Sequence, residues 1–229
     1  MMTTSISRSQ SAGGRGTPGR VVQDFISWID FAPTFVEAAE LDTHPQHSGR
    51  SFVDILASDQ DGWIDVRRDH VFTGKERHDV GREGDLGYPV RCIRTGDYLY
   101  VRNYEPDRWP AGNPETGYTN VDSSPTKTLI LDQHELGEDR YFDLPFGKLP
   151  AEELFDMRED HACMHNLADD PEHAEVKRSL SEQLNTALED HGDPRALGNG
   201  EIFDTYEYVG NASHSWWEYA EGAWEQQGY

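Results

Sequence analysis

The residues best suited to chemistry lie in the segment FTGKERH, residues 72–78. Lys75, Arg77 and His78 follow a short apolar stretch, and a loop after a strand can direct such side chains into a cleft. Arginine offers a planar fork of donors, lysine a point charge, and histidine can move a proton near neutral pH. The set suits an anionic ligand. A solvated loop whose cations offset neighbouring acidic residues explains the same pattern, and spacing alone favours this simpler interpretation.

A second candidate is HACMH, in which His161, Cys163 and His165 alternate like metal ligands. A structural zinc site normally needs four ligands, and the sequence offers no second pair at the usual spacing. His44 and His47 are interpreted as loop histidines for the same reason. We therefore predict no metal ligand in this chain.

Other catalytic motifs are missing from the sequence. It contains no phosphate-binding P-loop, no GxGxxG, no GxSxG and no HExxH, so dinucleotide, hydrolase-elbow and metalloprotease chemistry lack a sequence basis. Two cysteines, Cys92 and Cys163, are too few for a disulfide framework. We interpret both as buried or unreactive thiols.

Charge restricts the function further. The 229 residues include 20 basic and 43 acidic side chains, for a formal charge of −23, so nucleic acids and anionic membranes are disfavoured as partners. Mean hydropathy is −0.79, and no run of 18 apolar residues could span a bilayer. The N-terminus lacks the apolar segment of a secretory signal, which predicts a cytoplasmic location for the chain as written.

The acidic residues are dispersed along the chain, and only four of the basic residues are lysine. Self-repulsion at this charge would be screened over about 3 Å in 1 M salt. We therefore hypothesise a protein adapted to concentrated salt, a halophilic protein.

Several elements can be predicted around the candidate site. Residues 30–41 (DFAPTFVEAAEL) predict a helix that Asp30 or a neighbouring residue caps, and residues 70–74 predict a strand. The segments 89–95 and 97–104 alternate apolar and polar residues around a Gly96 turn, which predicts a β-hairpin. Its inward residues would be Val90, Cys92, Leu99 and Val101, and the outward, polar ones Arg91, Arg94 and Arg102.

The second half of the chain is less regular. Residues 105–150 predict a long ordered loop with at most a short helix near 128–136, and residues 153–157 predict another strand. Residues 171–191 predict a helix with Asp170 as cap and an apolar stripe of Val176, Leu180, Leu184 and Leu188. The aromatic, acidic tail 199–229 would pack on the fold, with sugar stacking as the less favoured role.

Two segments in the right order resemble the sulfatase family. GRVVQDFISWIDFAPTFVEAAEL followed by HSGRSFVDIL resembles the aspartate-x-x-proline-threonine stretch and its glycine-arginine-serine sequel. ELFDMREDHACMHNLADDPEHAEV resembles the family's segment ahead of its last helix. Between them, GKERH and LGYPVRCIRTGDYLYVRNYEPDRWPAG resemble the heparan N-sulfatase (sulfamidase) branch. The resemblance runs from about residue 19 to residue 208.

The resemblance implies an α+β fold. Complete members have an alkaline-phosphatase-like α/β domain and a smaller C-terminal domain, in which a four-stranded antiparallel sheet packs on a helix. This chain would be the C-terminal portion only. Residues 1–20 would be a disordered leader, 21–80 the remnant of the α/β domain, 81–198 the C-terminal subdomain with its sheet and the helix 171–191, and 199–229 the aromatic tail.

The family's catalytic groups are expected upstream of this sequence. They are a formylglycine made from Cys or Ser in (Cys/Ser)-x-Pro-x-Arg, and a calcium ion held by an early aspartate pair and a later aspartate–asparagine or aspartate–histidine pair. The similar Ser123-Ser124-Pro125-Thr126-Lys127 ends in lysine and lies downstream of Asp30, so it is not the nucleophile motif. We therefore expect no catalytic residue, no calcium ligand, and no sulfatase activity from this chain alone.

By the same resemblance, the loop that holds His78, Arg77 and Lys75 would face the sulfated sugar in a complete enzyme. A missing N-terminal sulfatase segment or a second copy of the chain would be the protein partner, as in a truncated or split reading frame. The alternative is a non-catalytic module that binds carbohydrate or protein. A fragment should leave Phe25, Ile29, Phe35 and Val36 as an apolar patch, whereas an evolved module would have polar residues there.

Overall fold

The computed structural model describes residues 19–210 and 215–223. The chain folds into two compact units, the first made of residues up to 72 with 93–97, the second of 73–92 and the residues from 98 onward. All but the last two residues of the predicted leader 1–20 lie outside the described residues, as do Trp224 and Tyr229 of the aromatic tail.

The first unit contains η1 (Trp28–Asp30), α1 (Phe31–Ala38) and α2 (Val53–Ala57). Asp30 is buried at the start of α1, and its carboxylate accepts hydrogen bonds from the Ser27 and Arg50 backbone N–H groups and from Arg68. The Thr34 hydroxyl donates to the Asp30 carbonyl at 2.6 Å and accepts from Phe52 N–H at 3.1 Å. The sequence DFAPT therefore forms the predicted helix, and its polar side chains join α1 to α2. The Asp30 carboxylate makes no capping hydrogen bond to α1, because Ser27, Arg50 and Arg68 engage it instead.

The main sheet has four strands in the order β1 (His70–Lys75), β2 (Val90–Thr95), β3 (Tyr98–Asn103) and β4 (Glu152–Asp156). β3 and β4 pair antiparallel, with Leu99 opposite Phe155 and Tyr100 opposite Leu154. The predicted hairpin is confirmed, because β2 and β3 are neighbours joined by the short turn at Gly96. The small antiparallel sheet with its helices confirms the α+β fold class.

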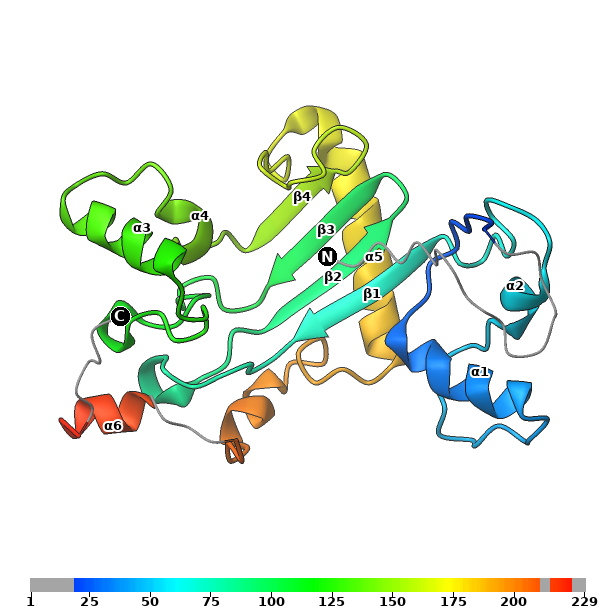
Figure 1. Cartoon of the computed structure of the whole chain (residues 1–229), viewed down its shortest axis with the longest axis horizontal. Helices are drawn as coiled ribbons and strands as arrows, with labels where there is room; N and C mark the ends of the chain where they lie inside the picture. Colours follow the sequence, from blue (N-terminus) through cyan, green and yellow to red (C-terminus); the bar gives the residue numbers. More distant parts are fainter. Residues whose placement is uncertain (1–18, 211–214, 224–229) are drawn as a thin grey trace. The chain divides into compact units, whose positions relative to one another are not determined.

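Helix α5 (Ala174–Asp190) lies across one face of this sheet (Figure 1). Leu180, Leu184 and Leu188 are buried along it, as the predicted stripe requires. The Tyr100 hydroxyl on β3 donates to Glu152 Oε1 and accepts from the Ser181 hydroxyl on α5 at 3.2 Å. The helix begins later than predicted, because residues 171–173 form a single 3₁₀ turn, η4, which Asp170 caps.

The predicted inward face of the hairpin was wrong. Arg91, Ile93 and Tyr100 are buried, whereas Val90, Cys92, Leu99 and Val101 are half-buried. Tyr100 lies on the face that α5 covers, and its hydroxyl is satisfied there by hydrogen bonds. Arg91 is tolerated inside because Glu76 and Asp193 neutralise its guanidinium. Apolar–polar alternation therefore assigned the two faces in the wrong order.

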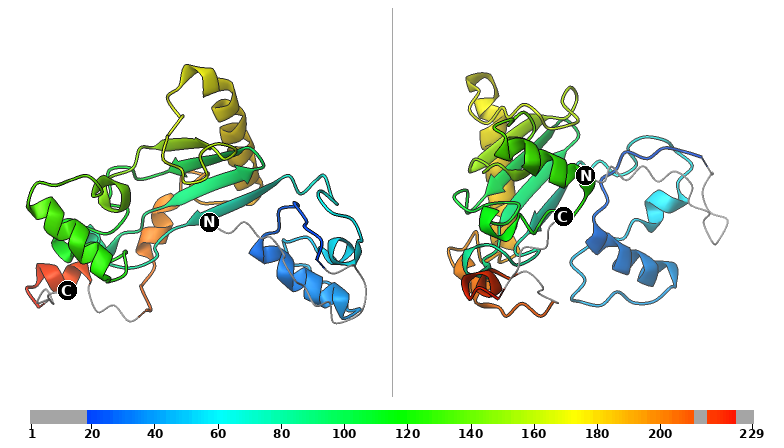
Figure 2. Two further views of the ribbon diagram at one scale, coloured as in Figure 1. Left: turned by 45° about the horizontal axis from the view of Figure 1, so that its top comes forward. Right: turned by 60° about the vertical axis from the view of Figure 1, so that its left-hand side comes forward.

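The segment 105–150 is more helical than predicted. It contains η3 (Pro114–Thr116), α3 (Pro125–Glu135) and α4 (Asp143–Phe146), and Figure 2 shows α3 and α4 together beyond one end of the sheet. Their packing comes from a cluster of buried residues, Ala111, Tyr118, Phe142 and Phe146. These side chains follow no single period in the sequence, which explains why the pattern predicted a loop.

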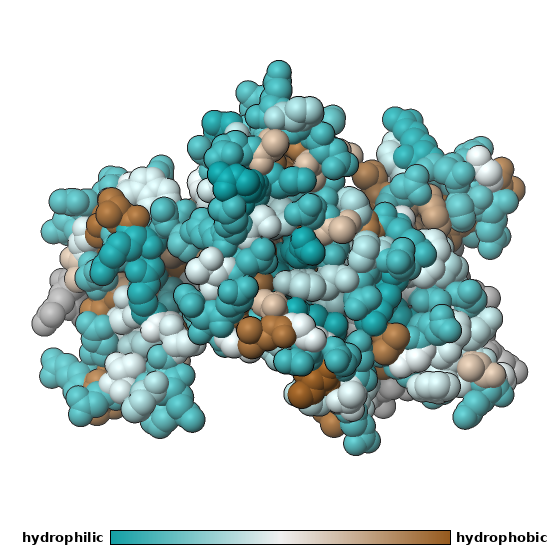
Figure 3. Space-filling view, turned by 180° about the vertical axis from the view of Figure 1, so that it is seen from behind, coloured by the Kyte–Doolittle hydropathy of each residue, from teal (hydrophilic) through white to brown (hydrophobic). Residues whose placement is uncertain are grey.

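The remaining elements are η2 (Glu83–Asp85), η5 (Gly200–Thr205) and α6 (Trp216–Ala220). Figure 3 shows one face of the molecule as mostly hydrophilic, with small separate apolar patches. Within the ranges that the structure describes, no helix is both long enough and apolar enough to cross a bilayer.

Candidate functional site

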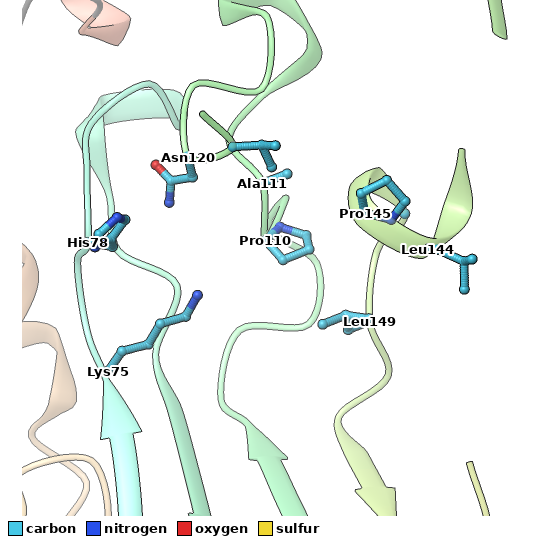
Figure 4. A pocket seen from close by; sticks show the side chains of 10 residues that line it. Lys75, His78, Pro110, Ala111, Asn120, Leu144, Pro145 and Leu149 are labelled. Carbon is cyan, nitrogen blue, oxygen red and sulfur yellow. The ribbon is translucent and has the colours of Figure 1, made fainter. Parts of the chain in front are cut away.

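A pocket of about 230 Å³ lies in the second unit and has two unlike walls (Figure 4). Lys75, His78 and Asn120 form the polar wall. The other wall is apolar, and its side chains are those of Pro110, Ala111, Val121, Leu144, Pro145 and Leu149. Pockets with an apolar lining and a few convergent polar groups are typical ligand sites.

Two of the three residues singled out in FTGKERH line this pocket. Lys75 is the last residue of β1, and His78 lies three residues on, so the strand end directs both toward the same space (Figure 4). Lys75 Nζ lies 5.7 Å from the centroid of the Tyr88 ring. Among the described residues, neither Lys75 Nζ nor the His78 ring has a hydrogen-bond or ion-pair partner. Both are therefore available to a ligand.

The surroundings of Lys75 change its acidity. Partial desolvation lowers the pKa of its ammonium group from the usual 10.5, although the residue as a whole is exposed, and repulsion from the Arg82 guanidinium lowers this pKa further. An anion bound beside Lys75 would favour the charged form of its ammonium group.

Arg77 is directed elsewhere. Its Nη2 donates to the Tyr206 carbonyl at 2.5 Å, and its guanidinium lies 5.4 Å from the centroid of the Tyr208 ring. The Tyr208 hydroxyl in turn donates to Asp79 at 3.3 Å. The structure therefore brings Lys75 and His78 together in one pocket and uses Arg77 to hold the segment that ends at Tyr208.

An ion-pair network supports the end of β1 where the pocket begins. Arg91 Nη2 donates to Glu76 Oε1 at 2.6 Å, and Arg91 Nη1 donates to the Lys75 carbonyl at 3.1 Å. Arg195 binds the other oxygen of Glu76 at 3.0 Å. The centroid of the Phe203 ring lies 6.0 Å from the Arg91 guanidinium and 5.6 Å from that of Arg195. This part of the aromatic tail therefore packs on the fold, as predicted.

The charge of the pocket lining is opposite in sign to the net charge of the whole chain. No aspartate or glutamate is among the residues that line it, although the chain carries 43 of them. Lys75 has only donors, the Asn120 amide can donate, and a neutral or charged imidazole can donate as well. This arrangement can bind an anion by charge-assisted hydrogen bonds.

Sequence patterns missed Asn120 and most of the apolar wall. Asn120 lies 45 positions after Lys75 in a segment predicted as a loop, and no motif marks it. Only the fold brings it near β1. The proline-rich composition of residues 105–150 was the one indication that this segment serves a site.

The segment Ser123–Lys127 has a structural explanation. The Ser124 hydroxyl caps α3 by accepting from Lys127 N–H at 3.1 Å, and Pro125 occupies the first turn. The Lys127 ammonium group is buried and donates to the Tyr118 and Val121 carbonyls. The likeness to the nucleophile motif therefore comes from a helix start.

The described residues also offer no evident metal site. Within residues 19–210 and 215–223, no group of three or more His, Cys, Asp or Glu side chains is placed to hold an ion. His161 and His165 are exposed, and Cys163 lies 3.8 Å from the Met157 sulfur.

Comparisons with known proteins point to one group. An ulvan-active sulfatase of Formosa agariphila is 26% identical over 176 residues, covering 77% of this chain and 31% of that protein. A second ulvan-active sulfatase of the same organism is 25% identical over 184 residues, covering 78% of this chain and 28% of that protein. No protein-family model matches the sequence.

Solved structures give weaker likenesses. A protein solved in complex with its substrate D-glucosamine-2-N,6-O-disulfate has 17% identity and a TM-score of 0.45, covering 78% of this chain and 25% of that one. A 2-O GAG sulfatase has 15% identity and a TM-score of 0.46, with coverages of 82% and 31%. The chain thus spans about a third of the length of the curated relatives it matches, and its sequence is similar to part of these ulvan-active sulfatases.

Proposed function

We propose that this chain is the C-terminal portion of a sulfatase and that its pocket binds the sulfated sugar of the substrate. The observation that carries the proposal is the pocket itself: Lys75, His78 and Asn120 face an apolar wall, and no carboxylate lines the space. A sulfate ester is a permanent anion that accepts hydrogen bonds, whereas a sugar ring has an apolar face. The two walls match these two parts of one ligand.

The proposed roles follow from the chemistry of each side chain. Lys75 would neutralise the sulfate charge, because its ammonium group has no other carboxylate partner in the described part of the chain. His78 would donate a hydrogen bond to a sugar or sulfate oxygen. Arg77 was expected to take part, but its contacts with Tyr206 and Tyr208 favour a supporting role.

The reaction of the complete enzyme would be hydrolysis of a sulfate ester or a sulfamate. The family resemblance assigns this chemistry to a formylglycine and a calcium ion that lie outside the segment resembling the family. We infer that these 229 residues alone bind sulfated sugar without cleaving it. The resemblance of GKERH favours a sulfamate substrate, as in the heparan N-sulfatase branch, whereas the two relatives are ulvan-active sulfatases. Substrate tests should therefore include both linkages.

The exposed apolar side chains of the first unit support the C-terminal-portion proposal over an independent module. Trp28 is 72% exposed, Ile29 55% and Phe35 66%, on and beside α1. Phe25 and Val36, also named in the predicted patch, are half-buried. An independent binding module would be expected to have polar residues there. We propose that further sulfatase sequence covers this surface.

Isothermal titration of the purified chain tests the proposal. Sulfated ulvan oligosaccharides should bind, and chemically desulfated oligosaccharides of the same length should bind at least ten-fold more weakly. A parallel assay with an aryl sulfate should show no turnover. Equal affinity for the two oligosaccharides would contradict the sulfate-binding role, and turnover lost on Ser123→Ala would contradict the non-catalytic role.

A further inference from the structure

The position of His78 in the pocket depends on its neighbours (Figure 4). His78 is exposed, and in the described part of the chain neither its ring nor its backbone has a hydrogen-bond partner. The loop that carries it closes where Tyr88 N–H donates to the Glu76 carbonyl at 3.1 Å. Arg77 and Asp79, the residues on either side of His78 in this loop, therefore determine where the imidazole lies.

Tyr208 contacts both of these flanking residues. The centroid of its ring lies 5.4 Å from the Arg77 guanidinium, and its hydroxyl donates to Asp79 Oδ1 at 3.3 Å. Asp79 Oδ1 also accepts from Val80 N–H at 2.8 Å, which fixes the carboxylate within the loop. One tyrosine side chain, 129 positions after Asp79, therefore bridges the residues before and after His78.

The backbone around Tyr208 restricts where its ring can lie. Two residues before it, the Tyr206 carbonyl accepts from Arg77 Nη2 at 2.5 Å. Two residues after it, a Cβ atom at Gly210 would lie 2.6 Å from Cζ of the Tyr208 ring, so a side chain there would displace the ring. The segment that carries Tyr208 is thus attached to the loop through both backbone and side chain.

We propose that Tyr208 is a positioning residue that holds His78 in the pocket as a hydrogen-bond donor to the sulfated sugar. Tyr208 is not among the residues that line the pocket, so its effect on binding passes through the loop. A side chain that must become ordered on binding costs affinity, and a loop fixed beforehand avoids this cost. The inference rests on the proposed sulfated-sugar function and deepens it, because it extends sugar recognition to the aromatic tail.

A double-mutant cycle tests this role by isothermal titration with a sulfated ulvan oligosaccharide. Tyr208→Ala and His78→Ala should each weaken binding by about ten-fold, and neither removes a lysine, arginine or carboxylate. If Tyr208 acts through His78, adding Tyr208→Ala to His78→Ala should weaken binding further by less than about two-fold. A purely structural role of Tyr208 would give the same additional loss in both backgrounds.

Tyr98→Ala is the matched control. The Tyr98 ring centroid lies 5.1 Å from the Arg158 guanidinium, and its hydroxyl accepts from Arg158 Nη2 at 2.9 Å. This variant therefore removes the same two kinds of contact at the start of β3 and should leave affinity unchanged. Tyr208→Phe retains the ring and loses only the hydroxyl bond to Asp79. It should weaken binding by about three-fold with an unchanged unfolding temperature, and it replaces Tyr208→Ala in the cycle if the alanine variant fails to fold.

The outcomes distinguish the two proposals. Wild-type binding with additive losses in the cycle overturns the Tyr208 inference and leaves the proposed function standing. Unchanged affinity in Tyr208→Ala, or equal weakening in Tyr98→Ala, overturns the inference in the same way. Failure of the wild-type chain to bind the sulfated oligosaccharide overturns the proposed function and the inference with it.

Discussion

Arg195 donates from Nη2 to Glu76 Oε2 at 3.0 Å and from Nε to the same oxygen at 3.2 Å, across 119 residues of sequence. Glu76 directly follows Lys75, and Arg91 holds both the Glu76 carboxylate and the Lys75 carbonyl. The segment after α5 therefore stabilises the end of β1, where the pocket begins. The candidate site thus depends on residues far beyond the FTGKERH segment.

Removing Arg195 should destabilise this support. Its side chain is 5% exposed, and Arg91 still pairs with Glu76 after its loss. The expected cost is therefore that of a hydrogen bond to a charged group, about 1.5–3 kcal/mol. We expect Arg195→Ala to lower the free energy of unfolding, measured in urea, by about that amount. Arg178→Ala breaks an exposed pair on α5 and should cost less than about 1 kcal/mol. Equal losses in the two variants would show that the network contributes little.

Lys75→Met should weaken binding of sulfated ulvan oligosaccharides by about ten- to a hundred-fold, because a hydrogen bond to a charged group contributes about 1.5–3 kcal/mol. Methionine retains most of the apolar volume, so the unfolding temperature should change little. Lys177→Met, which removes the same charge from α5, should retain wild-type affinity. Isothermal titration compares the three proteins, and equal weakening in both variants would attribute the effect to net charge.

Binding should also decrease at high pH. Only the ammonium form of Lys75 attracts an anion, and a bound anion raises its pKa relative to the free protein. Affinity is therefore complete below the pKa of the free protein and falls as pH rises through it. Since burial and Arg82 lower that pKa below the usual 10.5, the decrease should begin at a lower pH than for an exposed lysine. Titrations of wild type and Lys75→Met from pH 7 to 10 check this; a parallel decrease in both would contradict the role of Lys75.

The sequence predicted where helices and strands lie better than which of their residues are buried. Helix α1 and the β2–β3 hairpin depend on local signals such as Pro33 and the Gly96 turn, and both are confirmed. Arg91 was assigned to the polar face by alternation, yet it is buried because Glu76 and Asp193 neutralise it from distant positions. Periodicity measures apolar character and contains no information about such distant partners.

Only part of the polar wall of the pocket was predictable from the sequence. Lys75 and His78 stand out because cations follow a strand, whereas Asn120 and the apolar wall come from a segment without a regular period. Arg77 is equally basic in the sequence, but Tyr206 and Tyr208 engage it. Which of three neighbouring basic residues remains available is decided by tertiary contacts.

Ser124 and Ser123 provide a local test of the helix start. Ser124 caps α3, and replacing an N-cap serine by alanine costs about 1 kcal/mol. We expect Ser124→Ala to lower the free energy of unfolding by about this amount, and Ser123→Ala, at an exposed position outside the cap, to leave it unchanged. Urea denaturation of both variants checks the difference. A larger effect of Ser123→Ala would contradict the capping assignment.

Salt should affect folding and binding in opposite directions. At a net charge of −23, self-repulsion opposes the compact state, and screening within about 3 Å at 1 M salt removes most of it. The unfolding temperature should therefore rise between 0.05 M and 2 M KCl.

Attraction between Lys75 and a sulfate is screened by the same ions. Affinity for the sulfated oligosaccharide should therefore fall over this range, while the weaker affinity for the desulfated one should change little. An unfolding temperature independent of KCl would contradict the halophilic hypothesis, and a salt-independent affinity would contradict an electrostatic basis for binding in the pocket.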